Sequence, residues 1–458
     1  MATSNASRQR TPPWPLSERS VWREVDLLPF AHYLSVHPNG TAEPIRWWDP
    51  PAPELPTDLA APELRKALVA AVAARAGASS AIGADLSGGM DSTSLCFLAA
   101  EQGPRLVTIR RQLMDPRNCD DSIAGRAAAD LPAAEHIVLD KDTASPYYES
   151  PDRDDLAMDE PPPFIAMASH MEDVARIMAS HGVTRHLQGH GSDELAATGT
   201  TYVNALAQRS LLGSLGMVRA ARARRRWSLA TTLRVVRAFP PYAQWLHRSG
   251  DELLCPPDVE SEVGWEPAPR LPPWASREAA ALVREAITRT AGTDPQPMSS
   301  IPTQHEILRC IRVNGGIIRF ANTLGERFGV SFEAPFLDDR VVETALSVRM
   351  ADRYVVGRHK PVLAAALRGT VPDYVLDRTT KSHFTVDVYA GRKRNLAKMR
   401  EMCEESLLVD LGLIGREGFR RALSSTMPDP MHMGTLEKTM ACEAWLRSLP
   451  AKSSPQAH

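Results

Sequence analysis

Apolar residues between positions 62 and 190 follow two alternating patterns. Leu64, Leu68 and Val72 lie at helical spacing, whereas Ile82, Ala84 and Leu86 alternate with other residues as in a strand. The alternation continues, with strands expected at 106–109, 137–139 and 184–187 and helices at 94–100, 123–129 and 164–179. This order predicts an α/β fold in which a parallel sheet has helices on both faces. Ligands bind such sheets at the carboxyl ends of the strands.

The rest of the chain lacks this alternation. From about residue 202 the pattern is helical, and no Asp or Glu occurs from Leu195 to Gly250, where Arg219, Arg222, Arg224, Arg225, Arg226, Arg234 and Arg237 gather. Extended segments at 22–28 and 32–36 predict a hairpin. We expect five segments: a disordered N-terminus with this hairpin and a Pro-rich linker (1–56), the α/β core (57–200), an Arg-rich helical insertion (201–300), a second helical portion (301–450) and a disordered tail (451–458).

Composition argues against nucleic-acid-binding, membrane and secreted proteins. The chain has 458 residues and a net charge of -2, so no global field favours nucleic acid or membrane. The polar N-terminus lacks the apolar core of a secretory signal, and no apolar run is long enough for a membrane span. The 6 cysteines are scattered without CxxC spacing, as in a cytoplasmic protein with free thiols.

The segment Ser87-Gly88-Gly89-Met90-Asp91-Ser92 lies where a strand ends and a helix begins. Its glycines let the backbone turn, so that N–H groups of the turn and of the helix N-terminus face an anion. The hydroxyls of Ser87 and Ser92 are expected to donate to phosphate oxygens. Asp91 would repel a phosphate unless a cation lies between them, which predicts Mg²⁺. The alternative is a plain Gly turn with a Ser N-cap. The motif differs from GxxxxGK[ST].

A second Gly-rich turn, Gly189-His190-Gly191-Ser192-Asp193-Glu194, follows the strand at 184–187. Asp193 is the candidate second carboxylate on Mg²⁺, opposite Asp91; the alternative is a surface turn that starts a helix. His190 is a candidate general base toward an attacking amine, because the ordinary histidine pKa lies near neutrality. A structural role for His190 is equally open. Glu306, on an expected helix, is a candidate partner that orients it.

Two lysines are candidates to balance the negative charge of phosphates at this site. Lys360 precedes the apolar helix that contains Val362 and Leu363, and Lys381 lies in Arg378-Thr379-Thr380-Lys381-Ser382-His383-Phe384. The alternative is that both are solvated surface lysines.

With these motifs the chain resembles N-type ATP pyrophosphatases, a group that includes asparagine synthetase, β-lactam synthetase and lasso peptide cyclases. The resemblance covers about residues 60–415 and implies ATP cleavage between the α- and β-phosphates to form an acyl-adenylate. It implies nucleotide contacts at Leu86, Ser87, Gly88, Gly89, Asp91, Ser92, Gly189, Lys360 and Lys381, with Lys381 catalytic. It also implies that Glu333–Asp339 matches the PFLD segment beside the acyl acceptor.

Three features resemble actinobacterial lasso peptide cyclases more than asparagine synthetase: GHGSDE at 189–194 in place of GEGSDE, the acid-free Arg-rich stretch, and residues 387–414. Such an enzyme adenylates an Asp or Glu side chain of a ribosomal precursor peptide, and the peptide's own α-amine then closes a macrolactam, in antibiotic biosynthesis. The resemblance implies a leader-recognition protein and a leader peptidase as partners.

One departure from the family concerns the N-terminal glutaminase-like domain, of which Val25–Trp48 resembles only the last hairpin. No Cys follows Met1, so glutamine-dependent amidation by this chain alone is not expected. Amide formation on a small molecule, as in asparagine or β-lactam synthesis, stays open. A protein that binds or modifies RNA through Arg219–Arg237 is the alternative of another class, although Trp227 is the one aromatic residue between those arginines. A pseudo-enzyme is disfavoured by the intact carboxylates and lysines.

Overall fold

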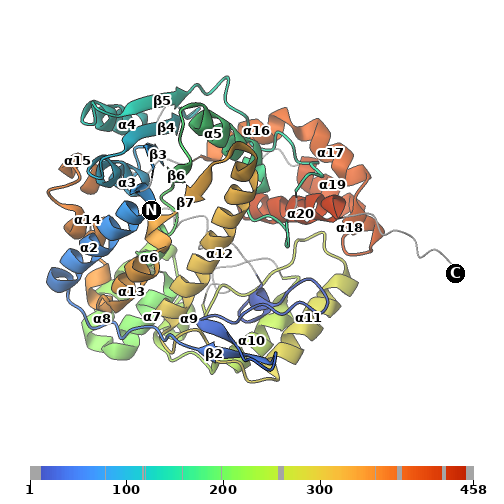
Figure 1. Ribbon diagram of the computed structural model, residues 1–458. Coiled ribbons are helices and arrows are strands. Elements are labelled where there is room, and N and C mark those ends of the chain that lie inside the picture. The colour runs from blue at the N-terminus through green and yellow to red at the C-terminus, as the bar shows by residue number, and fades with distance from the viewer. Residues whose placement is uncertain are drawn as a thin grey trace.

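The computed structural model describes residues 12–77, 79–115, 118, 120–156, 158–196, 199–255, 263–355, 357–378, 384–424 and 430–449. Its centre is a five-stranded sheet in the order β5-β4-β3-β6-β7, and every neighbouring pair is parallel (Figure 1). The strands are β3 (Ala81–Asp85), β4 (Arg105–Arg111), β5 (Glu135–Leu139), β6 (Arg185–Leu187) and β7 (Ser331–Glu333). The predicted α/β class and parallel sheet are confirmed.

Alternate residues of β3 face two different hydrophobic cores, because successive side chains of a strand point to opposite faces. Ile82 and Ala84 pack with the helices α2 and α3, whereas Ala81 belongs to the core that contains α5 and α12. The helices of the first half are α2 (Thr57–Ala76), α3 (Met90–Ala100), α4 (Asp120–Ala129), α5 (Ala168–Ser180) and α6 (Ser192–Leu195). The order of alternating strands and helices in the sequence therefore predicted correctly that helices cover both faces of the sheet.

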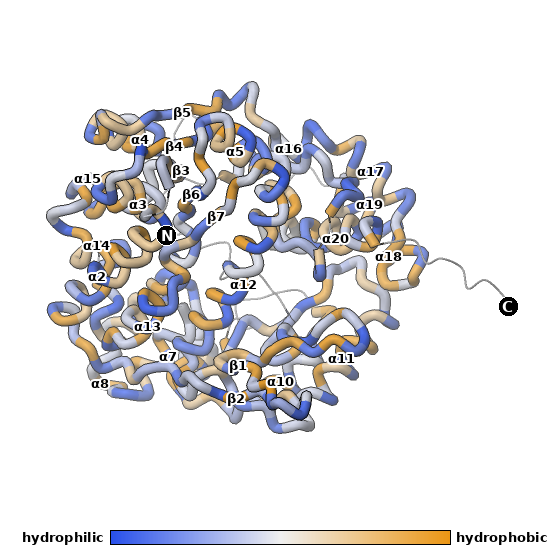
Figure 2. The backbone as a smooth tube through the Cα atoms, viewed as in Figure 1, coloured by the Kyte–Doolittle hydropathy of each residue, from blue (hydrophilic) through white to orange (hydrophobic). Residues whose placement is uncertain are grey.

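Helices dominate the second half. Those of the Arg-rich insertion are α7 (Thr200–Arg209), α8 (Leu211–Arg225), α9 (Leu229–Val236), α10 (Tyr242–Ser249) and α11 (Arg277–Ala291). The long α12 (Pro302–Gly325) crosses the middle of the molecule, with hydrophobic and hydrophilic residues mixed along it (Figure 2). It is followed by α13 (Asp339–Ser347), α14 (Pro361–Leu367), α15 (Asp373–Leu376), α16 (Thr385–Arg394), α17 (Leu396–Glu404), α18 (Leu407–Asp410), α19 (Arg416–Ser424) and α20 (Pro430–Ser448). Within the described residues no helix is both long and apolar enough to cross a membrane.

The hairpin near the N-terminus differs from the prediction. It is formed by β1 (His32–Val36) and β2 (Ala42–Arg46), and the segment 22–28 is not a strand. Trp22 instead donates through its indole nitrogen to the Asp159 carbonyl at 2.8 Å. Part of the segment expected to be disordered also makes defined contacts, since Leu16–Glu18 forms a 3-10 turn and the Trp14 backbone N–H donates to Glu266 at 3.2 Å.

Glu266 joins this N-terminal segment to the insertion and to α12. Its fully buried carboxylate accepts from the Tyr242 hydroxyl at 2.7 Å and lies 3.0 Å from the His305 ring. Burial raises the pKa of Glu266, but the His305 bond and the Arg309 charge outweigh burial and hold the pKa below its usual value. The group is therefore a charged structural link between three parts of the chain.

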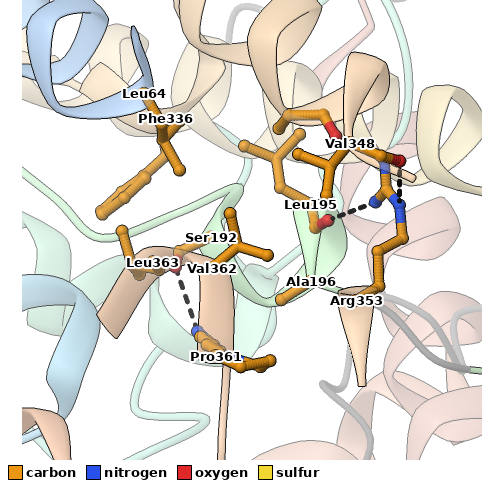
Figure 3. A pocket seen from close by; sticks show the side chains of 12 residues that line it. Leu64, Ser192, Leu195, Ala196, Phe336, Val348, Arg353, Pro361, Val362 and Leu363 are labelled. Atoms are coloured by element: carbon orange, nitrogen blue, oxygen red, sulfur yellow. Dashed lines mark hydrogen bonds between the residues drawn. The ribbon is translucent and has the colours of Figure 1, made fainter. Parts of the chain in front are cut away.

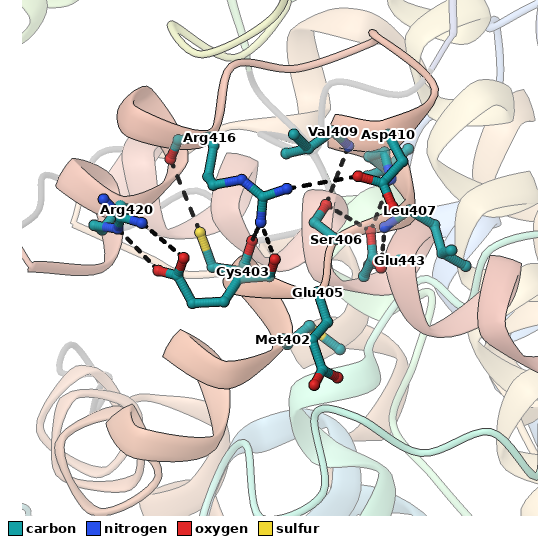
Figure 4. A network of polar contacts seen from close by, with 12 residues as sticks. Met402, Cys403, Glu405, Ser406, Leu407, Val409, Asp410, Arg416, Arg420 and Glu443 are labelled. Atoms are coloured by element: carbon teal, nitrogen blue, oxygen red, sulfur yellow. Dashed lines mark hydrogen bonds and ion pairs between the residues drawn. The ribbon is translucent and has the colours of Figure 1, made fainter.

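The last helices are held together by one buried carboxylate (Figure 4). Glu443 on α20 accepts from the backbone N–H groups of Leu407 and Leu408, at 2.8 and 3.1 Å, and from the Ser406 hydroxyl at 2.9 Å. These are the orphan donors of the α18 N-terminus, where a negative charge is favourable. The contacts fix the C-terminal helices against the core that covers the second face of the sheet.

Candidate active site

The phosphate loop joins β3 to α3 at the carboxyl edge of the sheet. Leu86 is buried and donates its backbone N–H to the Ile109 carbonyl at 2.8 Å, so the strand ladder runs up to the loop. At Gly88 φ is +78°, and a Cβ atom there would lie 2.2 Å from the Asp120 carbonyl oxygen. Only glycine fits this position. The Ser87 and Ser92 hydroxyls lie 2.8 Å apart across the turn. The loop thus presents a helix N-terminus and two hydroxyls on one side.

The second Gly-rich turn lies directly against this loop. A Cβ atom at Gly189 would come within 2.9 Å of both Asp91 Cβ and the Ser92 nitrogen, so a larger residue would separate the two turns. The PFLD segment closes the far side, because Leu337 packs against Gly191 and Asp338 pairs with Arg75 at 3.2 Å. Three segments distant in the sequence therefore converge on one edge of the sheet.

Lys360 occupies the centre of this convergence. Its buried ammonium bonds to Asp91, lies 2.7 Å from Asp193 Oδ1 and donates to the Ser192 hydroxyl at 3.1 Å. The Ser192 hydroxyl in turn donates to Asp91 at 2.7 Å. Burial alone lowers the pKa of this lysine, but Asp193 and Asp91 outweigh burial and raise the pKa above its usual value. The sequence placed these three charged residues in one site, and the structure brings them within contact distance.

The backbone of Lys360 is unusual for a residue with a side chain. Its φ and ψ are 47° and 58°, the left-handed conformation, and it precedes Pro361 at the first position of α14. Such a conformation costs on the order of 1–3 kcal/mol and persists where surrounding contacts impose it, often at functional sites. Here the left-handed turn directs the lysine toward the carboxylates.

Asp91 and Asp193 fit a divalent cation that is shared with phosphates. Both carboxylates contact the Lys360 ammonium, so together they already neutralise one positive charge. In the described part of the chain no group of three or more His, Cys, Asp or Glu could hold a metal alone. Mg²⁺ is commonly held by one or two carboxylates together with substrate phosphates. The donor set therefore suits Mg²⁺ that arrives with a nucleotide.

His190 lies at the turn with its ring half-buried. Its Nδ1 is 3.1 Å from Asn314 Oδ1, and Asn314 donates its Nδ2 to the Cys310 carbonyl at 2.8 Å. The second bond orients the amide, so the oxygen faces the histidine and Nδ1 is the nitrogen that carries the proton. Nε2 then keeps a free lone pair. The expected partner was wrong, since Glu306 accepts a bond from Thr201 and it is Asn314 that orients His190.

Lys381 lies outside the described residues, so the structure tests neither its position nor its role. Arg378, three residues earlier, is placed beside the phosphate loop. It donates to the Gly88 carbonyl and pairs with Asp120, and its side chain is buried. The sequence alone gave no expectation of a function for Arg378. The only signal was its closeness to Lys381, because an arginine near a phosphate loop is otherwise indistinguishable from a surface arginine.

A small apolar cavity has Lys360 among its lining residues, and Figure 3 shows the side chains that surround it. Its volume of about 40 Å³ suits water and not a nucleotide, and its lining includes Leu64, Phe336 and Leu363. Buried Arg353 borders it and donates to the carbonyls of Leu195 at 3.0 Å and Val348 at 3.3 Å. Burial lowers the pKa of Arg353 to about 10. Arg353 thus fixes the end of α6, the helix that carries Ser192 and Asp193.

Comparison with known proteins agrees with this geometry. A family model described as asparagine synthase matches residues 63–447, which include both Gly-rich turns, the PFLD segment and both lysines. A search of curated proteins finds no match.

Proposed function

The chain belongs to the asparagine synthase family, which supports ATP-dependent amide bond formation, and from this premise we propose that it closes a macrolactam in a precursor peptide. The side-chain carboxylate of an Asp or Glu in the peptide would be adenylated, and the α-amine of the same peptide would attack it. Adenylation is needed because a free carboxylate is a poor acyl acceptor and AMP is a good leaving group. A leader-recognition protein and a leader peptidase would deliver the peptide.

In the first step a carboxylate oxygen attacks the α-phosphorus of ATP, and the bond to pyrophosphate breaks. The N-terminus of α3 and the hydroxyls of Ser87 and Ser92 would hold phosphate oxygens. Lys360, which is charged, would balance the negative charge that develops on pyrophosphate, and we assign the same role to Lys381. Asp91 and Asp193 would hold Mg²⁺, which would supply further positive charge for the phosphates.

In the second step the amine nitrogen attacks the acyl carbon, a proton leaves that nitrogen, and the bond to AMP breaks. His190 is the proposed proton acceptor. The observation that carries this assignment is the bond from His190 to Asn314, because in the neutral ring it assigns the proton to Nδ1 and leaves the Nε2 lone pair to accept one. A base at this position is what an amine nucleophile requires.

The test separates the two steps. Adenylation is measured as exchange of labelled pyrophosphate into ATP in the presence of the precursor peptide. Ring closure is measured by mass spectrometry as the loss of one water from the peptide. We expect Asp91→Ala to abolish both. We expect His190→Ala to keep exchange but to slow ring closure by about 10²–10⁴-fold.

The acceptor panel decides between functions. Aspartate with ammonia is offered in parallel with the peptide. AMP and a dehydrated peptide support the proposal. AMP with asparagine would favour a small-molecule amide synthetase instead. Unimpaired ring closure by His190→Ala would remove His190 from the mechanism but leave adenylation intact.

A further inference from the structure

The insertion carries an exposed stripe along α8. Leu211, Leu215, Arg219 and Arg222 follow one another at intervals of four, four and three residues, so they line one side of the helix. All four are exposed, with Leu211 at 52% and Leu215 at 41%. The neighbouring Leu212 is 83% exposed. The side that faces the protein is formed by Ser214, Val218 and Ala221 instead. The leucines of the stripe therefore do not serve the core.

Helix α9 repeats the pattern. Leu229, Leu233 and Arg237, the residue that caps the C-terminus of the helix, are spaced four residues apart and are exposed, the leucines at 65% and 53%. Thr231 and Val235 of this helix are buried, and Val235 shares a small core with Val218 and Ala221. Both helices thus present leucines followed by arginine on the side away from their common core. Figure 2 shows hydrophobic and strongly hydrophilic residues along α8 at the edge of the molecule.

The charges of this surface lack counterparts in the chain nearby. No Asp or Glu occurs between Leu195 and Gly250. Among the ion pairs of the described residues, none involves Arg219, Arg222 or Arg237. Clustered arginines repel one another, and exposure of leucine side chains to water is unfavourable in free energy. A ligand for this surface must bring carboxylates or phosphates together with apolar groups.

We propose that the exposed side of α8 and α9, defined by Leu211, Leu215, Arg219, Arg222, Leu229, Leu233 and Arg237, docks an acidic amphipathic segment of another polypeptide. Charge complementarity selects the acidic partner, and arginine suits it because its planar fork pairs with carboxylates. The leucines require apolar side chains on the same face of that segment. This inference does not depend on the proposed reaction.

A membrane or RNA fits the stripe less well. A helix that lies on a membrane keeps its apolar residues on one face along its whole length. On α8 the leucines and the arginines lie on the same side of the helix, with the leucines nearer its N-terminus and the arginines nearer its C-terminus. A polypeptide segment can carry apolar and acidic side chains in the corresponding order. RNA recognition uses aromatic stacking, and Trp227 is buried.

The test uses the full chain and fluorescently labelled synthetic peptides of about 15 residues. One peptide carries Leu at i and i+4 and Glu at i+8 and i+11. A second has the same composition in scrambled order, and a third has Lys in place of Glu. We expect anisotropy to report salt-sensitive binding of the first peptide alone. We expect the double variant Arg219→Glu with Arg222→Glu to bind the first peptide at least about tenfold more weakly. We expect the same variant to bind the peptide that carries Lys in place of Glu. Leu211→Ser with Leu215→Ser should weaken binding of the first peptide as well.

Matched controls are Arg248→Glu on α10 and Leu282→Ser on α11, which change an exposed arginine and an exposed leucine elsewhere. Both should bind the first peptide normally, and all variants should keep the thermal midpoint of the parent. No binding of the first peptide at about millimolar concentration, or equal binding of the scrambled peptide, would overturn the proposal. So would binding of anionic lipid vesicles or of single-stranded RNA that depends on the same arginines and exceeds peptide binding.

Discussion

Two groups of charged residues in this chain follow opposite rules. At the sheet edge Lys360, Asp91 and Asp193 have opposite signs, are largely buried and lie in contact. On α8 and α9 Arg219, Arg222 and Arg237 have one sign and are exposed. The first group is balanced within the chain, so changing one member disturbs the fold and the site together. Within the described residues no ion pair involves the second group, so changing a member should disturb binding and leave the fold unaltered.

The largest effect is expected from Lys360→Met, which leaves two buried carboxylates without their cation. Removing one partner of a buried pair costs about 3–5 kcal/mol, and the loss of the charge should abolish AMP formation. Mg²⁺ should restore much of the stability, because it can replace the ammonium between Asp91 and Asp193. Thermal unfolding with and without Mg²⁺ measures this.

Lys66→Met removes an exposed lysine of α2 and serves as the control for Lys360→Met. It should unfold like the parent and respond to Mg²⁺ like the parent. If Lys360→Met lost no more stability than Lys66→Met, the claim that the buried charged group supports the fold would be wrong.

Arg378→Met should have the next largest effect, because this buried arginine joins the phosphate loop to Asp120. We expect a loss of about 2–3 kcal/mol in unfolding free energy and a raised KM for ATP. Asp120→Asn should cost less, and the double variant should cost less than the sum of the two. Denaturant unfolding of the four proteins gives the coupling, and additive losses would mean that the two side chains act separately.

Glu437 offers an intermediate case, a buried carboxyl for which the Ala166 backbone hydrogen bond and the Lys438 charge only partly offset burial. Burial raises its pKa to about 7, so the folded protein keeps the proton at pH values where the unfolded chain has lost it. Stability should therefore fall as pH rises from about 4.5 to about 7, by roughly 1–3 kcal/mol. Glu437→Gln should remove this part of the decline.

Denaturant unfolding between about pH 4.5 and pH 8 compares the parent with Glu437→Gln, and exposed Glu417→Gln is the control. Parallel curves for the parent and Glu437→Gln would show that the carboxyl is already ionised in the folded protein.

The smallest effect is expected from Arg219→Gln with Arg224→Gln, both exposed on α8. Unfolding free energy should change by less than about 0.5 kcal/mol. Any change should be a gain at low salt that disappears at high salt, since like charges are then screened. Calorimetry at two salt concentrations measures it, and a clear loss would mean that these arginines support the fold.

The sheet was predictable because a short apolar segment such as β3, which is buried on both faces, stands between segments with helical spacing such as Leu64, Leu68 and Val72 of α2. The short edge strand β7 was missed, since three residues with only Phe332 buried give no period to detect. The segment 22–28 was misread as a strand because its apolar residues Val25, Leu27 and Leu28 are exposed and carry no information about burial.

The site was predictable where a motif carries its own chemistry. Glycines, carboxylates and a lysine at turns led us to expect Asp91, Asp193 and Lys360 in one place, and they lie in contact; their roles stay predictions. Asn314 was not predictable, because one asparagine inside a helix has no local signature and its role depends on how α12 packs beside the turn. Glu306 was chosen for its charge, yet it lies eight residues, about 12 Å, from Asn314 along that helix.

The close approach of Gly189 to Asp91 limits how such a protein can be engineered. A single added carbon at Gly88 meets the Asp120 carbonyl at the start of α4, and one at Gly189 meets the phosphate loop, so the nucleotide side has no room for variation. His190 is half-buried, and one side-chain bond to the buried Asn314 orients it. Libraries that seek a new acceptor should therefore diversify the rim around His190 and Asn314 and keep both glycine turns fixed.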